Sequence, residues 1–322
     1  MSAPHFSVII PVYNRANVLP AAIGSVLSQT CQDFEIVVVD DGSNDDPETA
    51  LKQFHDPRIR FIRQDNRGGG AARNTGIDAA RGSFIAPLDS DDIFLPCHLE
   101  RMKKLLDGTR NTAGYARMLV DRGRGRFFAK PPRAIREGEP MGEYLLCARG
   151  FVPTITLVVE RPLAQQVRYH EKLRAAEDTD FAIRLAAAGC RFVMVEEPGA
   201  VWKDIADPMR ASAGGTSRYA EDFAAWLDAI KPAMTRRAWR GGRGWAYAKM
   251  LARDGHKFQA LKLYLAALLS GCYAPKLAVV VFLQIFLDAA RYRRLADMLI
   301  GWLHPGLDAR TAGISKPSLK KA

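Results

Sequence analysis

The chain has 322 residues, of which 48% are hydrophobic and 25% are charged. This composition is typical of one or two globular domains with a large core, and it excludes disordered and collagen-like chains. The five cysteines lie far apart and the six histidines are scattered, so the pattern disfavours zinc and redox sites and predicts a reducing compartment. The N-terminus lacks the features of a signal peptide, which predicts a cytoplasmic protein.

The net charge of +11 is concentrated towards one end of the chain. Residues 231–322 contain 17 Lys/Arg and 4 Asp/Glu. This excess indicates an anionic partner, either a membrane surface or a nucleic acid, although a solvated basic face explains it equally well. Because the region has no basic motif with interleaved aromatic residues, we expect no nucleic acid partner.

Apolar runs alternate with amphipathic segments over the first hundred residues. This alternation predicts βαβ units and a parallel sheet, in which ligands bind at the carboxyl ends of the strands, where the strand order reverses. The expected strands are 6–11, 34–39, 58–63 and 84–88, and the expected helices are 19–27, 46–54, 71–80 and 96–106.

Acidic and polar segments follow three of these strands, at Pro11–Asn14, Asp40–Ser43 and Asp89–Asp91. Parallel strands place their carboxyl ends at one edge, so we expect these segments to lie together. Like charges at close range repel, and a divalent cation would remove that cost, with only one or two protein carboxylates if phosphates supply the other oxygens. The alternative for the segment after residue 88 is a solvated acidic turn that caps the next helix.

A glycine-rich loop, residues 67–74, precedes the third expected helix. Glycines let the backbone approach a ligand closely, and the helix N-terminus offers amide groups to an anion. The pattern is neither a P-loop nor a dinucleotide-binding fingerprint. Arg73 at its end could pair with a phosphate or with one of the acidic tips.

Residues 113–160 predict a mixed or antiparallel extension of the sheet. The strand-like runs are Ala113–Val120 and Pro153–Glu160, and basic, Gly/Pro-rich segments between them indicate a mobile loop. We expect acceptor specificity to reside in loops around 120–155 and 200–220, where the sequence carries no readable code.

A helix is expected from about residue 177, because Phe181, Arg184 and Leu185 share one face and Gly189 follows as a stop signal. Asp178 then lies at the helix N-terminus, where the helix dipole favours the ionised carboxylate. A catalytic base must be ionised to accept a proton, so the position suits that role. Simple capping and charge–dipole stabilisation is the alternative.

Five motifs in this order and at this spacing resemble family 2 glycosyltransferases, the inverting, nucleotide-sugar-dependent enzymes of GT-A fold. The resemblance covers roughly residues 5–200. The matching segments are Ser7–Asn14, Val39–Ser43, Gly70–Gly76, Leu88–Asp92 and Ala176–Asp178.

The resemblance implies a role for matched residues in donor binding. Pro11 and Asp41 would hold the nucleotide base, usually uracil, with Tyr13 beside it. Arg73 would contact the nucleotide, and Asp89 would lie near the ribose and the metal. Asp91, the second carboxylate of a DXD pair, would bind Mg²⁺ or Mn²⁺.

The resemblance also implies the catalytic part of the site. Asp178 would be the base that takes the proton from the acceptor hydroxyl. Glu177, Trp202 and Lys203 are candidate contacts to the acceptor or the diphosphate, and the match at the last two is loose. The implied reaction is an inverting transfer from a UDP-sugar to a hydroxyl of a glycan or lipid-linked acceptor, in bacterial exopolysaccharide, capsule or lipopolysaccharide biosynthesis.

The expected fold is therefore α/β, a GT-A catalytic domain over residues 1–230 with a mostly parallel sheet flanked by helices. A basic helical region, 231–310, would follow, with a disordered tail over 311–322. Its apolar segments, Ala260–Leu269 and Leu277–Leu287, are too short to span a bilayer and could lie on the inner face of the plasma membrane. The competing functions are a nucleotidyltransferase acting on a sugar phosphate and a nucleic-acid-binding protein.

Overall fold

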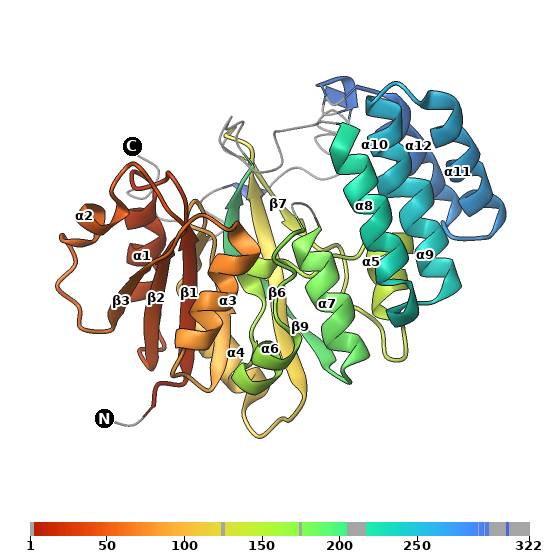
Figure 1. Ribbon diagram of the computed structural model, residues 1–322. Coiled ribbons are helices and arrows are strands. Elements are labelled where there is room, and N and C mark those ends of the chain that lie inside the picture. The colour runs from red at the N-terminus through yellow and green to blue at the C-terminus, as the bar shows by residue number, and fades with distance from the viewer. Residues whose placement is uncertain are drawn as a thin grey trace.

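The computed structural model describes residues 3–123, 126–173, 176–204, 217–288, 290–292, 294–295 and 307–308. Figure 1 shows sheets flanked by helices, with a group of helices from the C-terminal part of the chain beside them. The expected α/β fold with a C-terminal helical extension is confirmed. The proposed tail, 311–322, lies outside the described residues, and the boundary at residue 230 stays a prediction.

The first sheet has the strand order β3-β2-β1-β4-β8. The pairs β1–β2, β2–β3 and β1–β4 are parallel, and β8 is antiparallel to β4. The chain moves outward from β1 to β3 and then returns to place β4 on the other side of β1, so the strand order reverses between β1 and β4. The bounds are β1 (Phe6–Val12), β2 (Phe34–Asp40), β3 (Ile59–Arg63), β4 (Phe84–Pro87) and β8 (Val159–Glu160).

Helices cover this sheet as the sequence predicts, because β2 is buried along its whole length and needs cover on both faces. Of the four helices, α2 differs most from its expected bounds, because the expected helix covered 46–54 and the observed one ends at Leu51. The helices are α1 (Leu19–Leu27), α2 (Pro47–Leu51), α3 (Gly69–Ala79) and α4 (His98–Leu106).

The second sheet has the order β10-β7-β6-β9-β5 and mixed directions, since β6 and β9 are parallel while β7 and β5 run antiparallel to their neighbours. An isolated bridge between Gly114 and Val158 joins its β6 to the segment before β8, so the expected extension of the sheet is present. The bounds are β5 (Ile93–Phe94), β6 (Thr112–Asp121), β7 (Arg126–Lys130), β9 (Arg191–Lys203) and β10 (Leu307–Asp308).

The expected strand over Pro153–Glu160 is wrong for most of its length. Residues Thr154–Thr156 form a 3₁₀ turn, and only Val159–Glu160 pair as a strand. The Thr156 hydroxyl donates to the Ala116 carbonyl at 2.8 Å and accepts from the Ala116 amide at 3.3 Å. Hydrogen bonds from the Thr156 side chain thus replace the backbone hydrogen bonds of a strand at this point. The periodicity of the sequence does not reveal this exchange.

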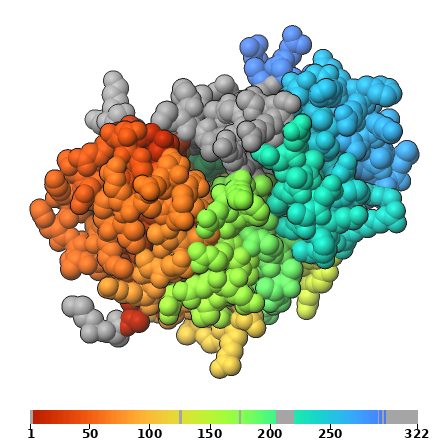
Figure 2. Space-filling view, in the orientation of Figure 1, coloured from red at the N-terminus to blue at the C-terminus, as the bar shows by residue number. Residues whose placement is uncertain are grey.

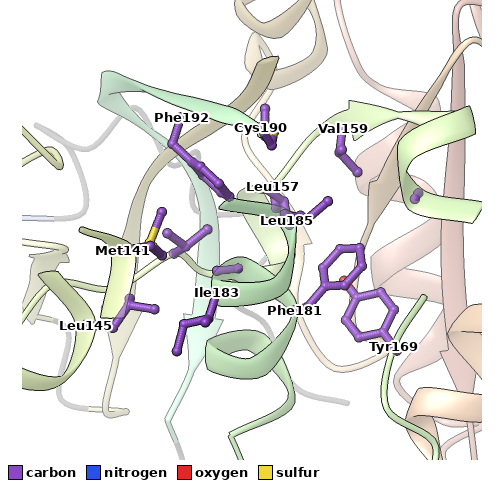
Figure 3. Close-up of a cluster of buried hydrophobic side chains, with 14 of the residues drawn as sticks. Met141, Leu145, Leu157, Val159, Tyr169, Phe181, Ile183, Leu185, Cys190 and Phe192 are labelled. Atoms are coloured by element: carbon purple, nitrogen blue, oxygen red, sulfur yellow. The ribbon is translucent and has the colours of Figure 1, made fainter. Parts of the chain in front are cut away.

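The core beneath α7 (Glu177–Ala187) joins the two sheets to the helices around them. Figure 3 shows Phe181 and Tyr169 face to face in this core, and their ring centroids are 4.1 Å apart. Leu185 and Ile183 of the same helix are also buried. This packing fixes α7, and with it the N-terminal turn that carries Asp178. The neighbouring helices are α5 (Met141–Cys147) and α6 (Arg161–Val167).

The C-terminal helices pack on the rest of the chain through α8, whose Trp226 and Leu227 enter the same core. The later helices form a hydrophobic cluster of their own, which includes Tyr264, Tyr273 and Val281. Within the described ranges, none of the helices has the length and apolar character needed to cross a membrane. The helices are α8 (Ser217–Ala229), α9 (Arg236–Gly242), α10 (Ala248–Arg253), α11 (Lys257–Leu269) and α12 (Pro275–Phe286).

The close approach of α3 to β1 gives a stability prediction. A Cβ added at Gly76 would overlap Cγ2 of Ile9 at the centre of the sheet, so Gly76→Ala should lower the free energy of unfolding by about 1–3 kcal/mol through overpacking. Urea unfolding would measure this. Gly24→Ala in α1 is the matched control, because nothing lies within 4 Å of its added Cβ, and it should unfold at the same or a higher urea concentration. Equal midpoints for Gly76→Ala and wild type would contradict the prediction.

Candidate active site

One arginine ties together the acidic turn after β4 and the start of α7. Arg73 Nη2 lies 2.6 Å from Asp89 Oδ1, and Arg73 Nη1 lies 2.8 Å from Glu177 Oε2. Burial alone would lower the pKa of Arg73, but the charges of Asp89 and Glu177 outweigh it and raise that pKa. Arg73 therefore stays charged and holds two carboxylates, separated by 88 residues, in one site. Of the two partners that the sequence left open, one acidic tip, Asp89, is a partner in the structure; the contact to a phosphate stays a prediction.

The three aspartates of the acidic turn have three different partners. Asp89 pairs with Arg73, while Asp91 Oδ2 lies 2.7 Å from Arg15 Nη1. Asp92 is buried and accepts a hydrogen bond from the backbone N–H of Lys203 at 3.0 Å. The positive and polar partners offset the repulsion expected between carboxylates so close in sequence.

Asp41, which follows β2, holds the glycine-rich loop. Its carboxylate accepts hydrogen bonds from the backbone N–H groups of Arg67 and Gly68, at 3.0 and 2.7 Å, and from the Gln64 amide at 2.7 Å. The loop passes close to the segment before α7, and a Cβ on Gly70 would come within 2.8 Å of the His170 carbonyl oxygen. The glycine is therefore required for packing at this position, whatever the loop binds.

The tips of β1 and β2 are joined by side-chain hydrogen bonds. The Asn14 N–H donates to Ser43 Oγ at 2.9 Å, and Asn14 Oδ1 accepts from the Asn44 N–H at 2.8 Å. Pro11 is half-buried, whereas Tyr13 is 44% exposed. An exposed aromatic ring at the carboxyl edge of a parallel sheet is a surface on which a planar base could stack.

Asp178 is the second residue of α7, and its Oδ1 accepts the Thr179 N–H at 2.8 Å. Burial raises its pKa to about 6, the charges of Glu177 and Asp89 add to the rise, and Arg73 opposes it. The helix dipole favours the ionised form, as the sequence indicated, but desolvation has the larger effect. At neutral pH the group is still mostly ionised, and a pKa near the working pH suits a general base.

Trp202 and Lys203 end β9, beside β6 and near β7. The Lys130 ammonium lies 5.5 Å from the Trp202 ring centroid, and burial lowers the pKa of Lys130 to about 8. Lys203 contacts the acidic turn through its backbone N–H, as described above for Asp92.

Sequence reasoning missed Arg15 and Lys130. Arg15 could have been found from its place just after β1, on the edge that carries the acidic tips.

Metal ligation was expected at Asp91. Nowhere in the described ranges do three or more His, Cys, Asp or Glu side chains gather closely enough to hold a metal ion. The possible metal ligands in the acidic turn are carboxylate oxygens, which suit Mg²⁺ or Mn²⁺ and not softer metals. These residues thus fit a cation only if a bound ligand completes its coordination.

These features define a class of protein: the topology is that of a GT-A glycosyltransferase, with acidic turns at the carboxyl edge and a carboxylate on the facing helix. The chain matches the model of "Glycosyl transferase family 2" over residues 7–155. This chain belongs to that family and is a glycosyltransferase. Membership favours sugar transfer over nucleotidyl transfer.

Relatives and a solved structure support this placement. The chain is 28% identical to the amylovoran biosynthesis glycosyltransferase AmsB of Erwinia amylovora, over 79% of this chain and 87% of the relative. It is 32% identical to the uncharacterized glycosyltransferase MJ1057 of Methanocaldococcus jannaschii, over 61% of this chain and 70% of the relative. The crystal structure of S. aureus TarS 1–349 in complex with UDP-GlcNAc matches with a TM-score of 0.65 and 18% identity, covering 94% of this chain and 92% of that one.

The electrostatics of the site predict two opposite shifts. Glu177→Gln removes a negative charge that raises the pKa of Asp178, so that pKa should fall below about 6. Arg73→Gln removes the opposing positive charge, so the pKa should rise. Carboxyl-carbon NMR titration of Asp178 would measure both. Glu48→Gln, an exposed change on α2, is the control and should leave the titration unchanged. Shifts of the same sign in the two site variants would refute the described electrostatics.

Proposed function

We propose that this chain transfers a sugar, with inversion, from a UDP-sugar to a hydroxyl group of a glycan or lipid-linked acceptor in exopolysaccharide assembly. The observation that carries the proposal is the position of Asp178, a half-buried carboxylate whose pKa desolvation raises to about 6, beside the Arg73, Asp89 and Glu177 cluster. The naming of one relative for amylovoran biosynthesis supports the pathway, and UDP-GlcNAc in the similar TarS structure supports the donor class.

The nucleotide would bind at the edge formed by the tips of β1 and β2. Tyr13 offers an exposed ring for stacking against the uracil, beside Pro11. Asp41 keeps the glycine loop in place and would meet the base with its remaining acceptor capacity. Arg73 and Asp89 lie at the reversal of strand order, where the ribose and diphosphate of a nucleotide bound in this crevice would reach.

Asp91 would hold Mg²⁺ or Mn²⁺ together with diphosphate oxygens from the donor. When bound, the ion would neutralise negative charge on the leaving diphosphate. Arg15 contacts the same carboxylate at 2.7 Å, so cation binding has to displace or share this contact. Arg15 would then pair with a diphosphate oxygen of the donor instead, which would keep its charge compensated.

The chemical step follows from the position of a single base. Asp178 accepts the proton of the acceptor hydroxyl while that oxygen forms a bond to the anomeric carbon. The bond from the anomeric carbon to the diphosphate oxygen breaks on the opposite face, and UDP leaves with the bonding electrons. One displacement inverts the anomeric centre, so an α-linked donor gives a β-linked product. Glu177 is held by Arg73 and is less suited to accept this proton.

Donor binding gives the first test. Calorimetry should show that UDP binds wild type more tightly with Mn²⁺ than without it, because the ion links Asp91 to the diphosphate. The variant Asp91→Asn should lose the metal-dependent part and keep the rest. Asp107→Asn, an exposed change at the end of α4 and away from the strand tips, is the control. Metal-independent UDP binding by wild type would remove the metal from the proposal, and failure of UDP to bind would remove the uridine donor.

The base gives the second test. Asp178→Asn should lower kcat by about 10²–10⁴-fold with little change in UDP affinity, since it removes only the proton acceptor. Wild-type kcat/KM should fall as the pH drops below about 6, because protonated Asp178 cannot act as a base. The anomeric coupling constant of the product, measured by NMR, should indicate a β linkage. A product that retains the α configuration would refute the single displacement.

A further inference from the structure

The outer face of α11 and α12 exposes large apolar side chains to solvent. Phe258 is 84% exposed, Leu269 is 87% exposed and Val279 is 60% exposed. Across the described ranges, Tyr13 is the one exposed large hydrophobic residue that lies outside this pair of helices. We call the exposed set the apolar platform; it consists of Phe258, Leu265, Leu269, Val279 and Phe282.

The platform residues lie on two helices that pack against each other. Phe258, Leu265 and Leu269 are spaced seven and four residues apart, so they share one face of α11. Tyr264, on the inward face of α11, is buried and contacts the ring of Phe282 on α12, with centroids 5.6 Å apart. Figure 1 places both helices at the end of the molecule opposite α2, and Figure 2 shows α11 and its neighbours forming the outer surface there. The platform is therefore set well apart from the strand tips of the active site.

The surroundings of the platform carry positive charge. Residues 257–286 contain three lysines and no aspartate or glutamate, and Lys257, Lys262 and Lys276 are all exposed. An arginine of α9 reaches the turn after Leu269, where Arg240 Nη1 lies 3.0 Å from Ser270 Oγ. Apolar side chains surrounded by cations match the boundary between the acyl chains and the headgroups of an anionic bilayer.

From this combination we infer that the apolar platform docks onto an anionic lipid bilayer, with its apolar side chains in the acyl boundary and its lysines against the headgroups. A second copy of this chain fits the surface less well, because an isologous contact would bring the lysines of both copies together. The helices would lie on the membrane and not cross it. Docking would hold the enzyme at a bilayer while its active site stays clear of the lipid. The benefit of this arrangement for a lipid-linked acceptor rests on the proposed function.

Vesicle sedimentation with the full chain tests the inference. Wild type should sediment with vesicles of equal parts phosphatidylglycerol and phosphatidylcholine, bind phosphatidylcholine vesicles much more weakly, and release as the salt concentration rises. The double variant Phe258→Ser, Leu269→Ser should bind anionic vesicles at least about tenfold more weakly, since two large apolar groups no longer insert. Both side chains are exposed, so the fold should be unaffected, which circular dichroism would check.

Lysine variants test the electrostatic part of the inference. The double variant Lys262→Gln, Lys276→Gln should bind anionic vesicles about tenfold more weakly than wild type. The matched control changes a lysine elsewhere. Lys52→Gln, an exposed lysine beside α2 at the other end of the molecule, should bind as wild type does. The catalytic variant Asp178→Asn should also bind vesicles like wild type, so failure of docking and failure of the proposed chemistry can be told apart.

Three outcomes would overturn the inference. Wild type could stay in the supernatant with anionic vesicles, or the Phe258→Ser, Leu269→Ser variant could bind them as tightly as wild type. Analytical ultracentrifugation without lipid could instead show a wild-type dimer that the same double variant dissociates, which would assign the platform to a second copy of the chain.

Discussion

The geometry of this site depends on the two ion pairs that the Arg73 guanidinium makes. This guanidinium is buried, it lies on a helix that packs against β1 and β2, and it binds one carboxylate from the turn after β4 and another from the start of α7. Two segments that the sheet topology brings near each other are thereby held at fixed distance. A buried cation is tolerated here only because two anions contact it, and the same contact lets those anions lie close together.

The pKa of Asp178 follows from this arrangement. Desolvation at the N-terminus of α7 raises it, Glu177 and Asp89 add to the rise, and the charge of Arg73 limits it. The balance leaves a carboxylate near pKa 6, which is basic enough to take a proton and still mostly ionised at neutral pH. A helix N-terminus alone would have given a weaker base, so the tertiary surroundings set the chemistry of this residue.

The three aspartates of the acidic turn after β4 each make a different contact. Asp89 belongs to the Arg73 cluster, Asp91 faces Arg15, and buried Asp92 fastens the turn to β9 through the Lys203 amide. This hydrogen bond holds Trp202 and Lys203, which belong to the second sheet, next to the carboxyl edge of the first sheet. At the other end of the molecule, α11 and α12 expose the apolar platform, well apart from the strand tips.

The sequence by itself determined the alternation of strands and helices, the gathering of the strand tips at one edge, and Asp178 at the start of a helix. These follow from local periodicity and from the rule that parallel strands of βαβ units end on the same side, which hold whatever the side chains contact. Only the tertiary structure decided that residues 154–156 form a turn and not a strand, that Arg73 reaches Glu177 across 104 residues, and that burial outweighs the helix dipole at Asp178. It also decided which faces of α11 and α12 stay exposed. Partner choice, desolvation and exposure depend on segments remote in sequence, and no local pattern encodes them.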